Sequence, residues 1–189
     1  KKLKSKLKII HITNFNERHN GRLFYNTGKR INNGLVRLGH SVLEFSDRDI
    51  LSNNRKLNDL NGAKYLNSKL LSVVGNYSPD LIILGHADLI DIKTLKTIKQ
   101  YYPQIKITQW FLDRMDSEWK NNKKRFLKKI DIMDSSFCTT DPNILKFSKK
   151  NLIYYIPNPV DESFETLSNY KNKNLKNDVF FAMSHGVHR

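Results

Sequence analysis

The sequence has 189 residues, of which 39% are hydrophobic, and a formal net charge of +15. This length and apolar content suffice for one domain with a sizeable core, and they exclude a disordered chain. The longest apolar runs, such as residues 81–84, fall far short of the roughly 20 residues of a membrane-spanning helix, so we expect none.

The first half of the chain alternates between the patterns of buried strands and amphipathic helices. Lys8 to Thr13 is a short β-branched run bounded by Asn14, which is typical of a buried strand. Apolar residues then recur at intervals of three and four until Gly39, a residue suited to a left-handed helix cap. The predicted elements are a strand over 8–13, a helix of about four turns over 23–38, a strand over 41–45, a helix over 60–73 and a strand over 80–84.

The second half continues the alternation. Pro103 closes one helix, Ser117 can cap the next, and Asp141 offers an N-cap that is followed by a proline. The predicted elements are a helix over 92–98, a strand over 105–111, a helix over 117–130, a strand over 135–139, a short helix from 141 to about 149, and a strand over 152–156. Because parallel strands need right-handed crossovers, this pattern predicts an α/β, Rossmann-like domain whose parallel sheet has helices on both faces.

The sequence after residue 156 indicates a boundary between domains. Pro157 and Pro159 cannot donate backbone hydrogen bonds to a central strand, so the chain leaves the sheet here. A polar stretch follows, and the apolar run from Val179 to Met183 has the pattern of a new strand. We therefore expect an N-terminal domain over 1–156, a linker over 157–177, and the first strand and loop of a truncated second domain over 178–189.

Ligands of parallel sheets bind beyond the carboxyl ends of the strands. No Gly-x-Gly-x-x-Gly pattern follows the first strand, and no Walker A motif occurs, which argues against NAD or FAD at this site. The first loop instead suits hydroxyl-rich or anionic ligands, although an ordinary polar connection would have the same composition. The candidate residues are Asn14, Asn16, Arg18, Gly21 and Arg22 after the first strand, Ser46 and Asp47 after the second, Gly85, His86 and Asp88 after the third, and Asp113 and Arg114 after the fourth.

Two residues of this set could handle a proton or orient a ligand. His86 directly follows the third strand, and an imidazole at the rim of a cleft can accept a proton. Asp113 ends the fourth strand beside Arg114. Both also have plain structural interpretations, because loop histidines often form hydrogen bonds and a carboxylate can cap the next turn.

Other reactive side chains do not form a site in the sequence. His185 and His188 have the spacing of metal ligands, but no third ligand lies nearby, so we predict no metal site. Cys138 falls in a predicted strand with no base close in sequence, so we expect a buried thiol. As the single cysteine it can form no internal disulfide, which fits a cytoplasmic protein.

The positive charge invites a nucleic-acid or anionic-membrane interpretation. It comes from 24 lysines and 9 arginines beside 21 asparagines, and an AT-rich coding sequence produces such an excess without selection for binding. Several lysines fall on one predicted helix, where we expect them to be solvated: Lys120, Lys123, Lys124, Lys128 and Lys129. A solvated surface is thus our expectation, with peripheral contact to anionic lipid at the inner face of the membrane as an alternative and nucleic acid as a more distant one.

Four segments carry a resemblance to a known family. They are Gln109-Trp110-Phe111-Leu112-Asp113, Asp134-Ser135-Ser136-Phe137-Cys138-Thr139-Thr140, Ile156-Pro157-Asn158-Pro159-Val160-Asp161 and Phe180-Phe181-Ala182-Met183-Ser184-His185-Gly186. Together they resemble bacterial glycosyltransferases of the GT-B fold, of the CgeB-like and group 1 type. The Pro-Asn-Pro-Val-Asp segment is the most specific, because in that family it links two Rossmann-like domains.

The resemblance implies transfer of a sugar from a nucleotide-sugar to a glycan, lipid or other hydroxyl acceptor, usually without a metal. The acceptor would lie against the loop over 14–22 and Arg114, with His86 or Asp113 as the base. The donor diphosphate would lie near Ser184, His185, Gly186 and Arg189. The family's late donor motif is absent, so we expect the chain alone to be inactive. A non-catalytic carbohydrate-binding or surface-assembly protein on the same scaffold is the alternative.

Overall fold

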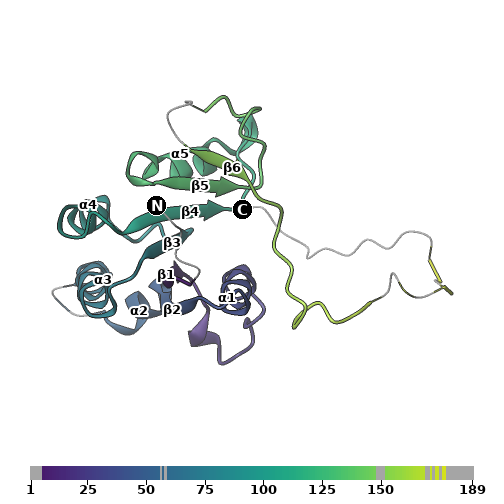
Figure 1. Cartoon of the computed structure of the whole chain (residues 1–189), viewed down its shortest axis with the longest axis horizontal. Coiled ribbons are helices and arrows are strands. Elements are labelled where there is room, and N and C mark those ends of the chain that lie inside the picture. The colour runs from purple at the N-terminus through teal and green to yellow at the C-terminus, as the bar shows by residue number, and fades with distance from the viewer. Residues whose placement is uncertain are drawn as a thin grey trace.

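The computed structural model describes residues 6–55, 57, 59–147, 152–168, 171, 173, 174, 176 and 177. Within them six strands form one sheet in the order β2-β1-β3-β4-β5-β6, and every neighbouring pair is parallel (Figure 1). The strands are β1 (Lys8–Thr13), β2 (Ser41–Ser46), β3 (Leu81–Gly85), β4 (Lys106–Phe111), β5 (Ser135–Cys138) and β6 (Ile153–Tyr155). The predicted Rossmann-like α/β fold is therefore confirmed.

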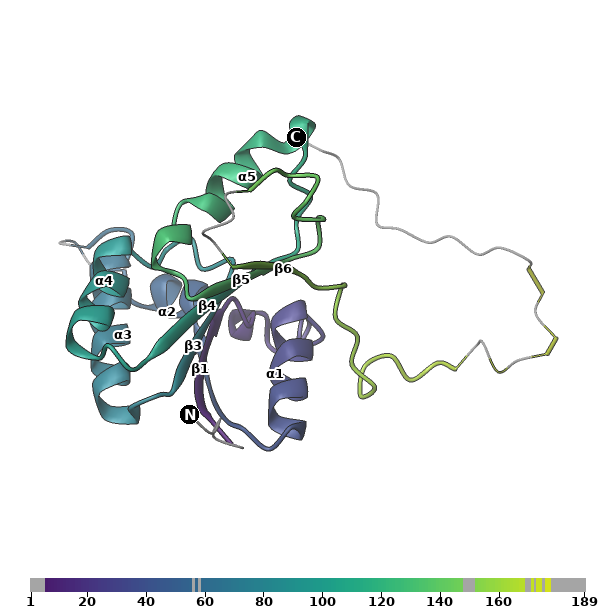
Figure 2. The same ribbon diagram turned by 45° about the horizontal axis from the view of Figure 1, so that its top comes forward.

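Helices cover both faces of the sheet, but unevenly. Figure 2 shows α1 on one side of the sheet and α3 and α4 on the other. The connection from β1 to β2 moves toward one edge of the sheet, whereas every later connection moves toward the other edge. Right-handed crossovers therefore place the later connections on the opposite face from α1. The α-helices are α1 (Thr27–Arg37), α2 (Asp47–Asn53), α3 (Ala63–Tyr77), α4 (Ile92–Tyr101) and α5 (Lys120–Leu127).

The larger apolar core lies between α3, α4 and the sheet. Leu70 and Val74 of α3 lie four residues apart on one helix face, and both are inaccessible to solvent. Leu95 and Ile98 of α4 do the same three residues apart, and Ile82 of β3 packs against this layer. The amphipathic spacing in the sequence thus corresponds directly to the buried faces of these helices.

A smaller apolar cluster lies beneath α5. It joins Phe111 at the end of β4 to Phe126 of α5 and to Cys138 of β5. The thiol is buried and free, as the sequence predicted. Burial raises the pKa of Cys138, which keeps it protonated and unreactive at neutral pH.

Helix starts differ from the sequence prediction where side chains cap earlier or later. α1 begins at Thr27 rather than near residue 23, because Asn26 accepts a hydrogen bond from the Lys29 amide at 3.1 Å. Gly39 has the left-handed conformation expected after this helix, with φ of 84°. The short helix α2 was not predicted, since its seven residues carry little apolar periodicity.

The predicted helix over 117–130 is interrupted. It consists of a 3-10 turn at Ser117–Trp119, then α5, then a second 3-10 turn at Ile130–Ile132, and Asp116 rather than Ser117 caps its start. The predicted helix from Asp141 does not form over 141–147, which make turns, and Lys146 has a left-handed φ of 51° that helices exclude. Residues 148 and 149 lie outside the described residues, as does the predicted strand over 179–183.

After β6 the chain runs back along α1 (Figure 2). The buried carboxylate of Asp161 accepts two hydrogen bonds from the Arg37 guanidinium, at 2.8 and 2.9 Å. Glu165 pairs with Arg30 at 2.6 Å, and the ring of Phe164 contacts Phe24 edge-on. We call residues 161–165 the strap, because these contacts fix the start of the predicted linker to α1.

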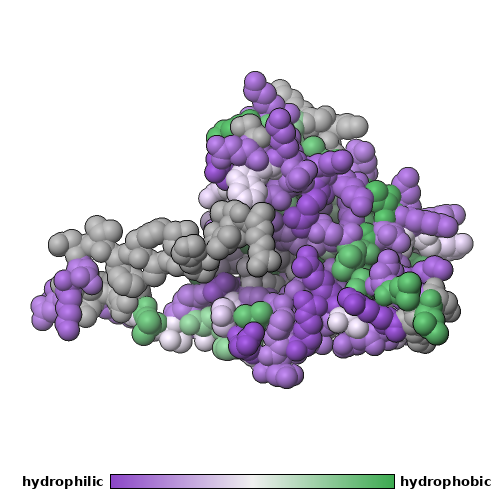
Figure 3. Space-filling view, turned by 180° about the vertical axis from the view of Figure 1, so that it is seen from behind, coloured by the Kyte–Doolittle hydropathy of each residue, from purple (hydrophilic) through white to green (hydrophobic). Residues whose placement is uncertain are grey.

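Polar groups dominate the surface seen in Figure 3, with apolar side chains only in smaller patches. Among the described residues, no helix combines the length and apolar character needed to cross a bilayer. The five lysines predicted to be solvated differ: Lys120, Lys124 and Lys128 are exposed, Lys123 is half-buried and Lys129 is buried. The expectation for Lys129 was therefore wrong, because it lies just after α5 and its ammonium group donates to the Ala87 carbonyl.

Candidate functional site

The strand order reverses between β1 and β3, because the chain moves from β1 outward to β2 and then crosses back to β3. In open α/β sheets ligands bind at such a switch point, outside the carboxyl ends of the strands. The loop after β1 and the segment that begins with His86 after β3 flank this point. The structure thus brings two of the predicted groups of candidate residues to one edge.

Asp49 at the start of α2 anchors the loop after β1. Its carboxylate accepts hydrogen bonds from the backbone amides of Glu17 at 2.9 Å and Arg18 at 3.4 Å, and the Ser46 hydroxyl donates to it as well. Ser46 in turn accepts a bond from the Phe15 amide at 2.9 Å. The loop is therefore held in one shape by groups on the neighbouring strand and helix.

The residues predicted to face an acceptor differ in how many of their polar groups could still bind a ligand. Asn14 donates a hydrogen bond to the side chain of Asn16 at 2.8 Å, so part of their amide capacity is used internally. Position 21 favours glycine, because its φ of 83° lies in the left-handed region. Arg18 and Arg22 are both exposed, and Arg18 lies 4.0 Å from Asp49. The loop thus offers two cations to solvent beside a partly satisfied amide pair.

His86 and Asp113 lie together at the ends of β3 and β4. His86 Nδ1 is 3.6 Å from an Asp113 carboxylate oxygen, and the Leu112 amide donates to His86 Nε2 at 3.4 Å. The imidazole stacks on Phe111 with ring centroids 4.4 Å apart. These contacts fit a neutral ring with its proton on Nδ1, directed at the carboxylate.

The protonation of His86 follows from its surroundings. Burial lowers its pKa, the charge of Asp113 opposes that shift, and Arg125 adds to it. The ring is therefore neutral at pH 7, with its lone pair on Nε2. Among the described residues, that lone pair is engaged only by the long bond from Leu112, so an incoming hydroxyl can compete for it.

Arg125, not Arg114, is the cation beside Asp113. Arg125 lies 3.6 Å from Asp113 and 2.5 Å from Asp88, and its guanidinium sits over the Phe111 ring. Arg114 instead pairs with Asp116 and with Glu118. No contact among the described residues supports the prediction that it acts in the cleft beside Asp113. Sequence reasoning missed Arg125, because its contacts with Asp88 and Asp113 join residues far apart in the sequence.

Two oppositely charged groups are buried beside this cluster. Lys129 donates a hydrogen bond to the Ala87 carbonyl, and burial lowers its pKa to about 8. Burial raises the pKa of Asp47 to about 6. One Asp47 oxygen accepts from the Arg48 amide at 2.8 Å, whereas the other has no hydrogen-bond partner among the described residues. The edge therefore holds charge that is only partly compensated.

A buried histidine and tryptophan lie beneath the site. The Trp110 indole donates to His11 Nε2 at 3.1 Å, and burial lowers the pKa of His11 to about 4. Gly85 makes room for this indole, because a Cβ at that position would lie 2.0 Å from a Trp110 ring carbon. Gly85 thus has a steric role, because it lets the Trp110 ring pack beside His86.

The predicted donor-side residues Ser184, His185, Gly186 and Arg189 lie outside the described residues. Within the described part, no group of three or more His, Cys, Asp or Glu side chains is placed to hold a metal ion. No protein-family model matches the chain, and no curated protein matches it either.

Proposed function

We propose that this chain forms the acceptor-side domain of a glycosyltransferase that uses a nucleotide-sugar donor. The observation that carries the proposal is the pairing of His86 with Asp113 at the sheet edge where a ligand would bind. Three further features support it: the parallel six-stranded sheet, the anchored polar loop after β1, and the Pro-Asn-Pro-Val-Asp segment that leads into the strap.

In the proposed reaction His86 acts as the general base. An acceptor hydroxyl displaces the Leu112 amide from Nε2 and gives its proton to that nitrogen, while Asp113 stabilises the imidazolium through Nδ1. The acceptor oxygen then bonds to the anomeric carbon of the donor sugar. The bond from that carbon to the diphosphate breaks, and the nucleoside diphosphate leaves with the electron pair.

The test is turnover by the full gene product that contains this chain. Release of UDP, GDP or TDP from a panel of nucleotide-sugars is measured with and without acceptor. His86→Gln should lower turnover by about a hundredfold or more, and Asp113→Asn by a smaller factor. His40→Gln is the matched control, because His40 precedes β2 at the opposite edge of the sheet, where it accepts a bond from the Leu7 amide.

Turnover near the wild-type rate in both site variants would remove the pair as base. A non-catalytic carbohydrate-binding protein is the second candidate, and one observation favours it: both ring nitrogens of His86 already have neighbours, at 3.4 and 3.6 Å. Saturable binding of oligosaccharides without any release of nucleoside diphosphate from the panel would support this second function.

A further inference from the structure

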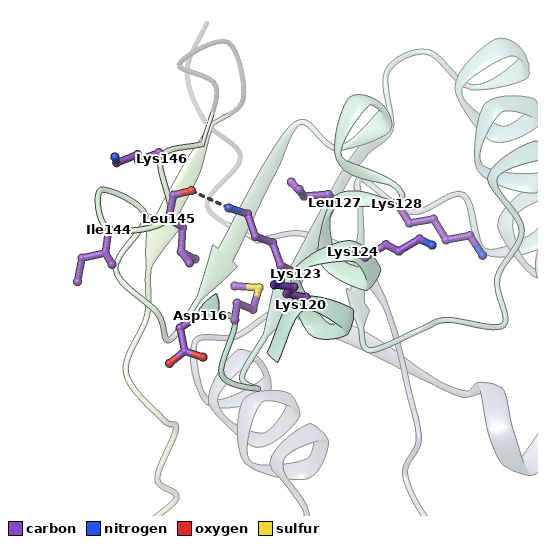
Figure 4. Close-up of a pocket in the computed structure, with 10 residues that line it drawn as sticks. Asp116, Lys120, Lys123, Lys124, Leu127, Lys128, Ile144, Leu145 and Lys146 are labelled. Carbon is purple, nitrogen blue, oxygen red and sulfur yellow. Dashed lines mark hydrogen bonds between the residues drawn. The ribbon is translucent and has the colours of Figure 1, made fainter. Parts of the chain in front are cut away.

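A groove of about 960 Å³ lies between α5 and the loop that follows β5. Figure 4 shows Ile144, Leu145 and Lys146 on the loop side and Lys124, Leu127 and Lys128 on the helix side. Arg125 of the same helix does not line the groove and pairs instead with Asp88 and Asp113 at the His86 site. Its volume is in the range of small-molecule sites, roughly 300–1,000 Å³.

The groove has an apolar floor because it borders the smaller core cluster. Met115 and Leu145 are buried members of that cluster, and Leu127 packs against it. Ile144 lies at the rim with 71% of its surface exposed. A hydrocarbon chain laid in the groove would cover the parts of Leu127 and Ile144 that water now contacts, which favours binding.

The loop wall is fixed in place before any ligand arrives. Lys123 of α5 donates a hydrogen bond to the Leu145 carbonyl at 2.8 Å, and its ammonium group lies 5.3 Å from the centre of the Phe147 ring. This tie spans the two walls. Binding therefore does not require the loop to be ordered first, which lowers the entropic cost.

The rim of the groove is positively charged. Lys120, Lys124, Lys128 and Lys146 are all exposed, and none of them pairs with a carboxylate in the part of the chain that the structure describes. The one acidic residue of the lining, Asp116, is neutralised by Arg114. An apolar floor beneath unpaired ammonium groups is complementary to a molecule with an apolar body and a negative head.

We propose that this groove binds a single anionic amphiphile, with its hydrocarbon chain on the apolar floor and its phosphate or carboxylate head among the lysines. A bilayer surface fits less well, because Met115 and Leu145 are recessed and cannot project into lipid. Nucleic acid also fits less well, because no lining residue is aromatic and bases would find nothing to stack on.

The experiment is calorimetric titration of the 189-residue chain with dodecyl phosphate below its micellar concentration. We expect saturable binding of one molecule per chain. Inorganic phosphate, which has the head alone, and dodecyl maltoside, which has the chain with a neutral head, should each bind about tenfold more weakly or worse. Equal binding of either probe would overturn the proposal.

Two variants locate the site. Lys124→Glu with Lys128→Glu should weaken dodecyl phosphate binding by roughly tenfold or more. Lys93→Glu with Lys96→Glu makes the same charge change on exposed positions of α4 and should leave it within about twofold. Ile144→Ser alters an exposed residue, so it should weaken binding of the hydrocarbon chain of dodecyl phosphate without unfolding the protein.

Three outcomes would reject the groove as a site for one amphiphile. The first is an equal loss in the α4 control. The second is binding to phosphatidylglycerol vesicles with no saturable binding of monomeric dodecyl phosphate, which would indicate a bilayer-docking surface. The third is full competition by a single-stranded oligonucleotide, which would indicate nucleic acid. None of these results depends on whether the protein transfers sugar.

Discussion

The apolar core beneath α3 and α4 and the charged cluster at the carboxyl edge share the same strands, yet they are built in opposite ways. In the core, Leu70 and Ile82 are fully buried within a cluster of apolar side chains. At the edge, Asp47, Lys129 and His11 are nearly as buried, with 1%, 7% and 0% of their surface exposed, although all three can carry charge.

The apolar core is thus optimised for stability, and the charged edge is not. Burying an ionisable group costs free energy unless it is fully paired, and an oxygen of Asp47 and a nitrogen of His11 have no hydrogen bond among the described residues. A sheet of this kind does not need such groups in order to fold. Their concentration beside His86 and Asp113 is what a ligand site would require.

Truncation of a core residue should give the largest effect on stability. Leu70→Ala removes a side chain with no exposed surface, so we expect a loss of about 2–5 kcal/mol in the free energy of unfolding. Urea titration followed by circular dichroism measures this loss. Leu60→Ala is the matched control, since 74% of Leu60 is exposed and its truncation should cost under about 0.5 kcal/mol. Similar losses in both variants would show that the core does not dominate stability.

The core and the sheet could be predicted from the sequence because they depend on periodicity. Ile10 and Ile12 alternate along β1, and Leu66, Leu70 and Val74 repeat along α3, so local spacing already specifies which face is buried. The prediction was wrong where one side chain decides the structure. Asn26 delays α1, and turns replace the helix that Asp141-Pro142 indicated.

The charged edge could be predicted only in part. Its strand-end members, His86, Asp88 and Asp113, follow from the rule that ligands lie beyond the carboxyl ends of parallel strands. Arg125 lies on α5 and Lys129 just after it, and nothing in the local sequence says which lysine or arginine of this segment turns inward. Long-range pairs of this kind become visible only once the crossover is built.

The buried charges should give the stability of the protein two opposing pH dependences. The folded pKa of Asp47, about 6, is above its value in the unfolded chain, so its contribution falls as pH rises from about 4 to 6. The folded pKa of His11, about 4, is below its unfolded value, so its contribution rises from about pH 4 to 6.5. Each contribution is of the order of 2–3 kcal/mol, so they largely cancel in the wild type.

Asp47→Asn should unmask the His11 contribution. The variant should gain about 2–3 kcal/mol in the free energy of unfolding between pH 4.5 and 6.5 relative to the change in the wild type over the same interval. Urea titrations at the two pH values measure this. The double variant Asp47→Asn with His11→Gln should lose most of the dependence. If stability changed with pH equally in the wild type and Asp47→Asn, burial would not raise the pKa of Asp47.

Asp161 contrasts with Asp47, because it is a buried carboxylate with a full set of partners. Arg37 donates two hydrogen bonds to it and the Ser163 amide donates a third at 2.8 Å, which holds the pKa of Asp161 below its usual range. Its energetic role is local, since residues 161–165 belong to none of the three buried apolar clusters. Asp161→Asn should therefore leave global unfolding little changed while it frees the strap.

Amide hydrogen exchange of the chain measures this release. In Asp161→Asn the amides of Ser163, Phe164 and Glu165 should exchange faster, whereas the amides of β1 and β3 should keep their protection. Glu162→Gln is the control, because that side chain is 85% exposed and makes only a 3.5 Å contact with Arg37. If strap exchange were the same in both variants, the paired carboxylate would not be what fixes the chain to α1, and the strap would depend on Phe164 and its contact with Phe24 instead.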